Sequence, residues 1–492
     1  MEMQIPALII IFVFTFIPLW IGELSRRASL NNVEDFFVQG RRMPTVVLFL
    51  TVYATWWSSF AFLGSTSYFY TKGPIYLTAI AWNILFGVLF YLVGKRIWHY
   101  GKAHKYITPT DFFDDIYGSK LLNIIITIIM MIFTILYLQI QLSGGAYLIE
   151  VASGGIIPWR VSGLVFYLVI IIYLWAGGLR AVAWADIFYS ILIFSGLVIG
   201  GLYLSYQAGG ISYLFQQVYV NDPSYLKLPG PSGNSGILLW FCMFLMTPIG
   251  ALMGPQLWIR MYAAESGKAF NIMPFLLTLM TIAYMGAVLS GYSGLLLEPN
   301  LSRPDTIFPV LLVKYAPAWL AAFLFCCGAA AALSTANAQI HAISAVYSID
   351  IHKKYIHRDI SDRSLVRVGR WAIIIFSVGA YIVLIQSPDL IVQSGLIALS
   401  GTAQVFVPVI GALFWNKSNA NAAIAGVITG ITILIVSTYI LHFTASYGGT
   451  FGLLVNALVF IILSRFSKEN SRVSNKIFAY KKAYEEFLAS DR

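Results

Sequence analysis

Long apolar runs alternate with short polar segments along the whole chain. Most runs are close to or longer than the roughly 20 residues that a helix needs to cross a bilayer. The pattern therefore predicts an all-α polytopic membrane protein with 13 transmembrane helices, several of them tilted or interrupted. The expected spans are 4–22, 44–69, 74–98, 120–152, 159–177, 181–206, 235–258, 269–297, 317–347, 366–386, 389–415, 420–442 and 448–465.

Positive charge is distributed unevenly between the segments that join these spans. If Met1 lies outside and each span reverses the side, 26 of the 31 Lys and Arg residues fall inside. Cytoplasmic loops of membrane proteins carry such an excess. We therefore expect an outside N-terminus, a cytoplasmic C-terminus and a location in the plasma membrane, with a prokaryotic inner membrane as the setting. The same topology accounts for the net charge of +10, so nucleic-acid binding has no support.

The composition agrees with this class of protein. Residues are 59% hydrophobic and 11% charged, with a mean hydropathy of +0.78, whereas a soluble domain carries about 25% charged residues. The first run lacks a basic n-region and a small-residue cleavage site, so we interpret it as a retained helix. The three cysteines lie in apolar spans and are expected to be buried thiols. The mildly amphipathic tail suits an anionic membrane surface, with a solvated tail as the alternative.

Two spans carry signals for a break in the helix. The span 44–69 has polar residues near its centre, between Ala54 and Ser59, although it has no proline or glycine there. The span 235–258 contains helix breakers, which free backbone groups that a membrane protein must satisfy in another way. These breakers are Pro248, Gly250, Gly254 and Pro255.

Paired interrupted helices in corresponding positions indicate an inverted-repeat transporter. The expected repeats are two five-helix halves, 44–206 and 235–415, joined by an outer loop at 207–234. An extra transmembrane helix and the first inner loop precede them at 1–43. Two C-terminal transmembrane helices follow at 416–466, and then a cytoplasmic tail at 467–492.

One apolar segment of the second half contains a polar stripe. Ser334, Thr335, Asn337, Gln339 and His341 lie in the middle of the span 317–347. Polar groups at membrane depth are expensive and usually face a cavity, a partner or an ion path. Adjacent hydroxyls suit a hard cation. The alternative is that both hydroxyls bond back to carbonyls one turn earlier.

Several short motifs are similar to those of one transporter family. They are Asp35-Phe36-Phe37 with Gly40-Arg41-Arg42, Thr110-Asp111-Phe112 with Tyr117-Gly118-Ser119, Trp175 to Val182 with Trp184-Ala185-Asp186, Arg260 to Ala264, Ala332 to Gln339, and Trp415 to Ala420. On these residues the chain resembles, over nearly its full length, the sodium/solute symporter family, which includes proline, pantothenate, sialic acid and sugar symporters. The resemblance implies a LeuT-like inverted-repeat (5+5) core with one extra helix before it and two after it.

The resemblance also implies a sodium site between the first and eighth core helices. Its ligands would be the carbonyls of Ala54, Trp57 and Ala331 together with the hydroxyls of Ser334 and Thr335. Oxygen ligands suit a hard cation, and a neutral set holds a monovalent ion loosely enough to release it. A sodium ion is the expected cofactor.

In some members of the family, the acid that matches Asp186 joins a second sodium site with hydroxyls on the eighth core helix. Asn337 and Ala338 stand at those positions here and lack hydroxyls, so we expect one sodium per cycle. Asp186, Asn337 and His341 are then expected along the ion exit or gate. Two alternatives stay open: Asp186 pairs with Arg180 or another nearby base, and His341 is either a packed neutral side chain or a proton-coupling group.

Candidate solute-binding residues come from five core helices. They are Thr55, Trp56 and Ser58 on the first, Tyr76 on the second, Gln141, Gly144 and Gly145 on the third, Thr247 and Gly250 on the sixth, and Gln404 and Phe406 on the tenth. None is a Lys or Arg, so a carboxylate would be met by amides and helix N-termini at the breaks. Packing is the alternative for the glycines and the aromatic side chains. Trp56 replaces the ion-linked aspartate of the proline symporter, which argues against a direct analogy with proline transport.

These features predict a secondary active transporter. It would take up a small polar organic solute (a carboxylate, an amino acid or a pantothenate-like compound) with sodium, by alternating access. The alternatives are a proton-coupled or uncoupled carrier of the same fold, and a transporter-like membrane sensor. An enzyme is not expected, because the histidines show no metal-ligand spacing and no catalytic motif occurs. The expected partners are the solute and the lipid bilayer, with no obligate protein partner.

Overall fold

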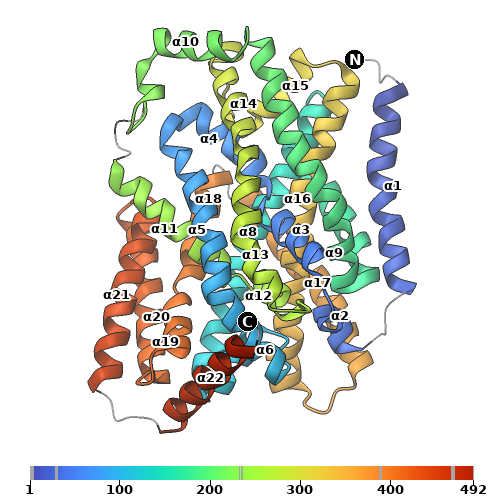
Figure 1. Cartoon of the computed structure of the whole chain (residues 1–492). Coiled ribbons are helices and arrows are strands. Elements are labelled where there is room, and N and C mark those ends of the chain that lie inside the picture. Colours follow the sequence, from blue (N-terminus) through green and yellow to red (C-terminus); the bar gives the residue numbers. More distant parts are fainter. Residues whose placement is uncertain are drawn as a thin grey trace.

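The regular structure of the chain is helical throughout the described residues (Figure 1). The computed structural model describes residues 5–27, 32–231, 233, 236–386, 391–466 and 471–490. Nine helices in these ranges are long and apolar enough to cross a membrane, and one bent pair adds a tenth. The all-helical membrane fold is therefore as predicted, whereas the count of 13 spans is not confirmed. Three further apolar helices, Phe16–Ser25, Thr45–Trp56 and Trp159–Ile171, are shorter than a full span.

The helices form a bundle whose first and last long apolar helices, α1 and α21, lie at opposite edges. Figure 1 shows α1 at one edge of the bundle and α20 and α21 at the opposite edge, with α10 at one end and α22 at the other. The longer elements are α1 (Ile5–Arg27), α8 (Lys120–Ala152), α9 (Trp159–Gln207), α16 (Ala318–Val346), α17 (Asp362–Gln386) and α21 (Ala445–Phe466). The shorter ones include α4 (Ser65–Lys72), α5 (Thr78–Leu89), α10 (Ile211–Asn221), α13 (Lys268–Met280), α14 (Tyr284–Leu297), α15 (Ile307–Tyr315), α18 (Ile391–Ala403), α19 (Phe406–Phe414) and α20 (Ala420–Ile435).

Helix α9 contains two of the expected spans, 159–177 and 181–206, which meet at Gly178. This residue has φ +58° and ψ −160°, a left-handed conformation that glycine adopts without steric cost. A Cβ atom there would lie 2.8 Å from the backbone oxygen of Phe36. The chain therefore turns sharply at Gly178 and packs closely on the segment before the first core helix.

The first core helix is broken near its middle. Helix α3 (Thr45–Trp56) ends where Trp57 leaves the helical region, with φ −88° and ψ 76°. The chain resumes through a π-helical turn, η2 (Phe60–Gly64), and α4. The Ser58 hydroxyl accepts a hydrogen bond from the Phe60 N–H at 3.1 Å and so caps the second half. Serine as a cap explains a break in a segment without proline or glycine.

The sixth core helix is broken at Gly254, where the sequence predicts an interruption. Helix α11 (Ile237–Met253) and helix α12 (Pro255–Ala263) meet there at an angle of 57°. Proline at the first position of α12 starts the second half, since its missing N–H is not needed there. A backbone contact also joins the segment before α3 to the end of α12: the Met43 N–H donates to Ala263 O at 2.9 Å.

The C-terminal tail forms helix α22 (Ser471–Ser490), which packs on the protein and not only against membrane or solvent. It lies on α6 (Lys95–His104) and α7 (Pro109–Tyr117). Tyr480 stacks on Tyr100 with ring centroids 4.4 Å apart, and its hydroxyl lies 2.8 Å from that of Tyr106. The guanidinium of Arg96 lies over the Tyr484 ring. The aromatic face of the tail helix therefore packs on α6 and α7, a contact that the sequence did not predict. The position of the tail relative to membrane and solvent stays a prediction.

Candidate functional site

The break in α3 releases two backbone carbonyls at membrane depth. In a continuous helix, the N–H groups of Ser58 and Ser59 would donate to the carbonyls of Ala54 and Thr55. The Ser58 N–H donates to Trp56 O instead, at 3.2 Å. The Ser59 N–H donates to the side-chain oxygen of Gln141 on α8, at 3.0 Å. The carbonyls of Ala54 and Thr55 are therefore free to accept other donors.

Two hydroxyls of α16 meet these carbonyls. Ser334 Oγ donates to Ala54 O at 2.8 Å and to Ala331 O at 3.2 Å. Thr335 Oγ1 lies 3.0 Å from Thr55 O and 3.4 Å from Ala54 O. All of these residues are buried. The back-bonding alternative holds only in part, because Ser334 reaches its own helix and α3 together, whereas the contacts of Thr335 are all to α3.

The structure brings together four of the five predicted sodium ligands. Ala54, Ala331, Ser334 and Thr335 share one cluster, while no contact joins the Trp57 carbonyl to it in the described part of the chain. The carbonyl of Thr55 is an additional member that sequence reasoning assigned to the solute instead. The cluster offers neutral oxygens from two helices, a donor set that fits a hard monovalent cation.

Asp186 belongs to a buried ion pair below this cluster. Its Oδ2 lies 3.1 Å from Arg260 Nη2 and 2.5 Å from the Thr51 hydroxyl. Arg260 Nε donates to the same hydroxyl at 2.9 Å, and the ionic side chains are 0% and 1% exposed. Asp186 therefore pairs with Arg260 of α12 and not with Arg180. This pair ties both broken helices to α9.

Arg180, the alternative partner considered for Asp186, forms its ion pair with Asp35 instead. Arg180 Nη2 lies 2.5 Å from Asp35 Oδ1 of helix α2 (Val33–Val38).

His341 Nε2 lies 3.0 Å from Phe36 O, and its ring packs between those of Phe36 and Phe37. A carbonyl only accepts, so Nε2 carries the hydrogen. This geometry agrees with the packed-histidine alternative.

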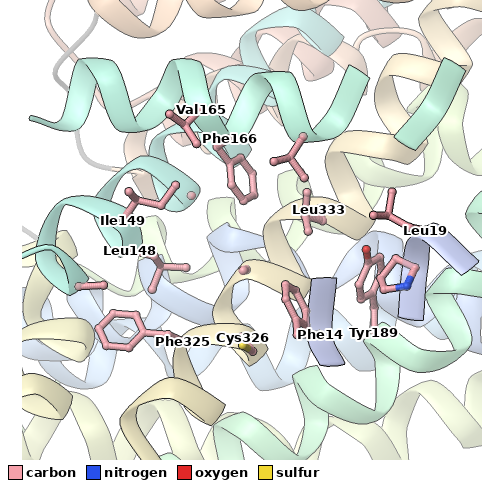
Figure 2. A pocket seen from close by; sticks show the side chains of 15 residues that line it. Phe14, Leu19, Leu148, Ile149, Val165, Phe166, Tyr189, Phe325, Cys326 and Leu333 are labelled. Carbon is pink, nitrogen blue, oxygen red and sulfur yellow. The ribbon is translucent and has the colours of Figure 1, made fainter. Parts of the chain in front are cut away.

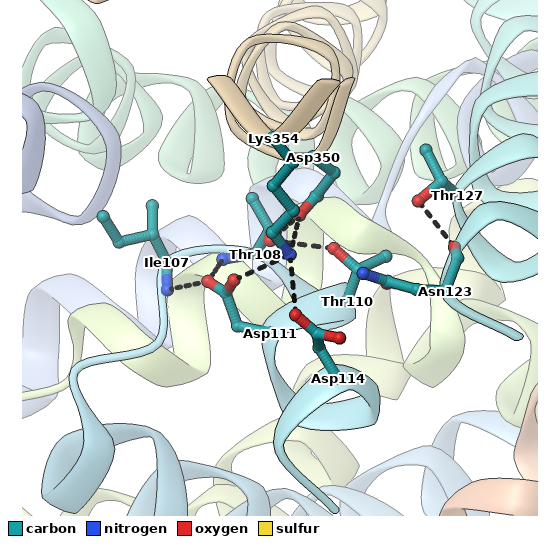
Figure 3. A network of polar contacts seen from close by, with 9 residues as sticks. All are labelled: Ile107, Thr108, Thr110, Asp111, Asp114, Asn123, Thr127, Asp350 and Lys354. Carbon is teal, nitrogen blue, oxygen red and sulfur yellow. Dashed lines mark hydrogen bonds and ion pairs between the residues drawn. The ribbon is translucent and has the colours of Figure 1, made fainter. Parts of the chain in front are cut away.

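A polar network lies at the C-terminal end of α16 (Figure 3). There α16 continues into the π-helical segment η8 (Tyr347–Ile356). Lys354 Nζ lies 3.0 Å from Asp350 Oδ1 and also contacts Asp111 and Asp114 of α7, at 3.4 and 3.6 Å. Thr108 donates to Asp350 at 3.1 Å. The family-like motif around Asp111 therefore anchors α7 to the C-terminal extension of the helix that carries Ser334 and Thr335.

Several predicted solute residues gather at the α3 break. Gln141 holds the Ser59 N–H, and the Ser58 hydroxyl lies 3.3 Å from the Tyr137 hydroxyl. Gly144 faces Ser59 so closely that a Cβ atom would lie 2.3 Å from the Ser59 hydroxyl oxygen. Thr55 lies in the same break, and its hydroxyl has no protein partner among the described residues.

The aromatic candidates line the other side of α3. Trp56 Nε1 donates to Asn83 Oδ1 at 2.6 Å, and its ring stacks on Phe86. Tyr76 packs edge-on against Trp82, with its hydroxyl 3.3 Å from that of Ser65. Both residues are buried, which agrees with the packing alternative for the aromatic set.

The remaining solute candidates lie away from the α3 break. The Gly250 carbonyl accepts a hydrogen bond from Thr402 at 2.8 Å. Gln404 donates to Gly449 O of α21 at 3.0 Å. Three others also lack a contact with the break among the described residues. Gly145 faces Phe166, and Phe406 packs beside Met246 and Ile249. The Thr247 hydroxyl has no partner among the described residues. A solute role for these five residues remains a prediction.

Sequence reasoning missed a group of polar residues at the α11–α12 break. A space of about 10 Å³ there, about the volume that one water needs, is lined by residues of α8, α11, α12, α16 and α18. Both amide atoms of Gln339 have no protein partner in the described chain, although the side chain is fully buried. The polar lining residues are Thr134, Tyr137, Gln256, Gln339 and Thr402. Gln339 belongs to the polar stripe, which was the available signal.

A comparison with known families identifies the class of protein. The profile of the sodium:solute symporter family matches residues 36–430. The chain belongs to the sodium:solute symporter family. Membership supports sodium-coupled uptake of a solute as the function of this membrane protein, as predicted.

Similar proteins cover the chain almost from end to end. The sodium/pantothenate symporter of Escherichia coli (strain K12) is 25% identical, over 95% of this chain and 97% of its own length. The osmoregulated proline transporter OpuE of Bacillus subtilis (strain 168) is 24% identical, over 97% and 98%. Among solved structures, a Na⁺-coupled sialic acid symporter in a substrate-bound outward-open state has a TM-score of 0.81 at 20% identity, covering 95% of this chain and 99% of that chain. Mhp1, a nucleobase-cation-symport-1 family transporter, has a TM-score of 0.60 at 13% identity, covering 90% and 98%. These likenesses support the expected LeuT-like fold.

Proposed function

We propose that the chain transports one sodium ion together with one small polar organic solute, such as a carboxylate, an amino acid or a pantothenate-like compound. The observation that carries the proposal is the convergence of Ser334 and Thr335 on the carbonyls released by the α3 break. A hydroxyl can donate to a carbonyl or turn its lone pairs toward a cation. The same groups therefore serve with and without the ion.

The sodium ligands in this proposal are the carbonyls of Ala54, Thr55 and Ala331 and the hydroxyls of Ser334 and Thr335. Since α3 and α16 both contribute, binding of the ion would hold the broken helix against its neighbour. Sodium is driven inward by its gradient and by the membrane potential, which supplies about 2.3 kcal/mol per charge per 100 mV.

The solute is proposed to bind at the α3 break, close to this ion. The polar groups there are neutral: Ser58, Thr55, Tyr137 and Gln141. The buried Arg260 is already paired with Asp186. A solute carboxylate would then be met by hydroxyls and side-chain amides at the break, since the N–H groups of Ser58, Ser59 and Phe60 already have partners. The similar transporters named for proline and pantothenate support this solute class.

Transport is proposed to follow alternating access, with release on the cytoplasmic side. Asp186, Asn337 and His341 lie between the ion cluster and the inner face in this scheme. The pair of Asp186 and Arg260 would have to separate, because it joins both broken helices to α9. We further propose a prokaryotic plasma membrane with the N-terminus outside, supported by the excess of Lys and Arg on the inner side.

Currents evoked by sodium jumps on proteoliposomes test this proposal. The solute panel contains carboxylates, amino acids and sugars, each at the same concentration. We expect a current with a carboxylate or amino acid, and its loss in the variant Ser334→Ala/Thr335→Ala. A response to sugars alone would reject the solute class. Undiminished sodium stimulation in the double variant would reject the ion site.

A further inference from the structure

An apolar cavity of about 560 Å³ lies between α1 and the core of the bundle (Figure 2). Buried side chains of α8, α9 and α16 form its floor, among them Leu148, Phe166 and Leu333. Its rim includes Leu19 of α1 and Val169 of α9, which are 47% and 44% exposed. Exposed apolar surface on a membrane-spanning bundle faces lipid, so the cavity opens toward the bilayer.

The chemistry of the lining excludes the polar solute and water. Among the described lining residues, all side chains except those of Tyr189 and Cys326 are hydrocarbon, or the residue is glycine. A cavity lined in this way stays dry, and it offers too few hydrogen-bond partners for a polar compound. An apolar occupant is therefore required to fill it.

The lining of the cavity extends along one helix. Along α16 it runs from Phe325 to Leu333, which corresponds to about 12 Å of helix rise. The cavity therefore follows the axis of α16, which suits a linear apolar occupant.

We propose that the cavity binds one acyl chain of a membrane phospholipid. An acyl chain is apolar, narrow and present in the bilayer at the open rim. Phe325, Ala329 and Leu333 recur every four residues and so share one face of α16. Ser334 and Thr335 contact α3, so the acyl chain supports the ion-site helix from another side. The assignment does not depend on the identity of the solute.

Photocrosslinking in lipid nanodiscs tests the assignment on the full chain. The phosphatidylcholine carries a diazirine in the middle of one acyl chain, and mass spectrometry locates the adducts after irradiation. We expect adducts on floor residues such as Leu148 and Cys326, which are 4% and 6% exposed. A lipid confined to the outer surface reaches only the rim. Adducts on rim residues alone would overturn the proposal.

A filling variant separates occupation of the cavity from general contact with lipid. Ala329→Trp places an indole in the cavity and should abolish the floor adducts. Ile375→Trp, at a 60% exposed position of α17 outside the cavity lining, should leave them unchanged. If the first variant does not fold, Cys326→Phe replaces it. Floor adducts that persist in a folded filling variant would also overturn the proposal.

Discussion

The buried pair of Asp186 and Arg260 gives the sharpest stability prediction. The two side chains are 0% and 1% exposed and lie 3.1 Å apart, and Thr51 bonds to both. Asp186→Asn keeps the volume but leaves the guanidinium charge without a counter-ion. Breaking a buried pair from one side costs about 3–5 kcal/mol. We expect a loss of unfolding free energy in that range.

Replacing Asp186 and replacing Arg260 should lower the free energy of unfolding by different amounts. A carboxyl group can take up a proton and become neutral, whereas a guanidinium remains charged in proteins. Arg260→Met is therefore expected to cost less than Asp186→Asn. The double variant buries no charge, so its loss should be smaller than the sum by about 1.5–3 kcal/mol.

Reversible unfolding in mixed micelles, titrated with a denaturing detergent, measures these differences. The matched control is the partly exposed pair of Lys314 and Glu298, which are 53% and 19% exposed and whose atoms lie closer together, at 2.8 Å. Because Lys314 is 53% exposed, Glu298→Gln should cost less than about 1 kcal/mol. Equal losses for Asp186→Asn and Glu298→Gln, or strict additivity in the double variant, would refute the reasoning.

Two further predictions concern the buried Asp305 just before α15 and the second break. Burial raises the pKa of Asp305 to about 6, although the Ile391 N–H opposes the shift. The ordinary pKa of an aspartate is 3.8. The stabilisation from protonated Asp305 is therefore complete below pH 3.8, and the free energy of unfolding falls, by roughly 3 kcal/mol, as the pH rises to about 6. Thermal unfolding of Asp305→Asn should lack this slope; an unchanged slope would contradict the assignment. Gly250→Ala places a Cβ atom 2.0 Å from Leu399 O and should lower the free energy of unfolding by about 1–3 kcal/mol. Gly379→Ala is the control, since nothing lies within 4 Å of a Cβ atom there, and it should not destabilise the protein. Equal melting temperatures for the two variants would contradict this prediction.

Much of the architecture could be predicted because its signals are local. Lengths of apolar runs and the distribution of Lys and Arg follow directly from the bilayer as a solvent. The break at Gly254 follows from backbone chemistry. The contact of Ser334 and Thr335 with Ala54 came from a family resemblance, because two helices 280 residues apart carry no mutual signal in one sequence.

The parts that could not be predicted depend on partners distant in the chain. Asp186 and Arg260 are separated by 74 residues, whereas the pairing kept open from the sequence was with Arg180 or another nearby base. The contact of Thr335 with the Thr55 carbonyl depends on where Gln141 accepts a hydrogen bond from the Ser59 N–H, which frees that carbonyl. The amphipathic tail showed an apolar face without showing what covers it.

Direct binding of radioactive sodium to the purified protein tests the central claim most closely. The native chain should bind about one ion saturably, and Ser334→Ala/Thr335→Ala should bind none at the same concentrations. Ser344→Ala is the matched control, since this buried hydroxyl on the same helix donates only to His341 O among the described contacts; it should bind sodium as the native protein does. Unchanged sodium binding in a folded Ser334/Thr335 double variant would contradict the account.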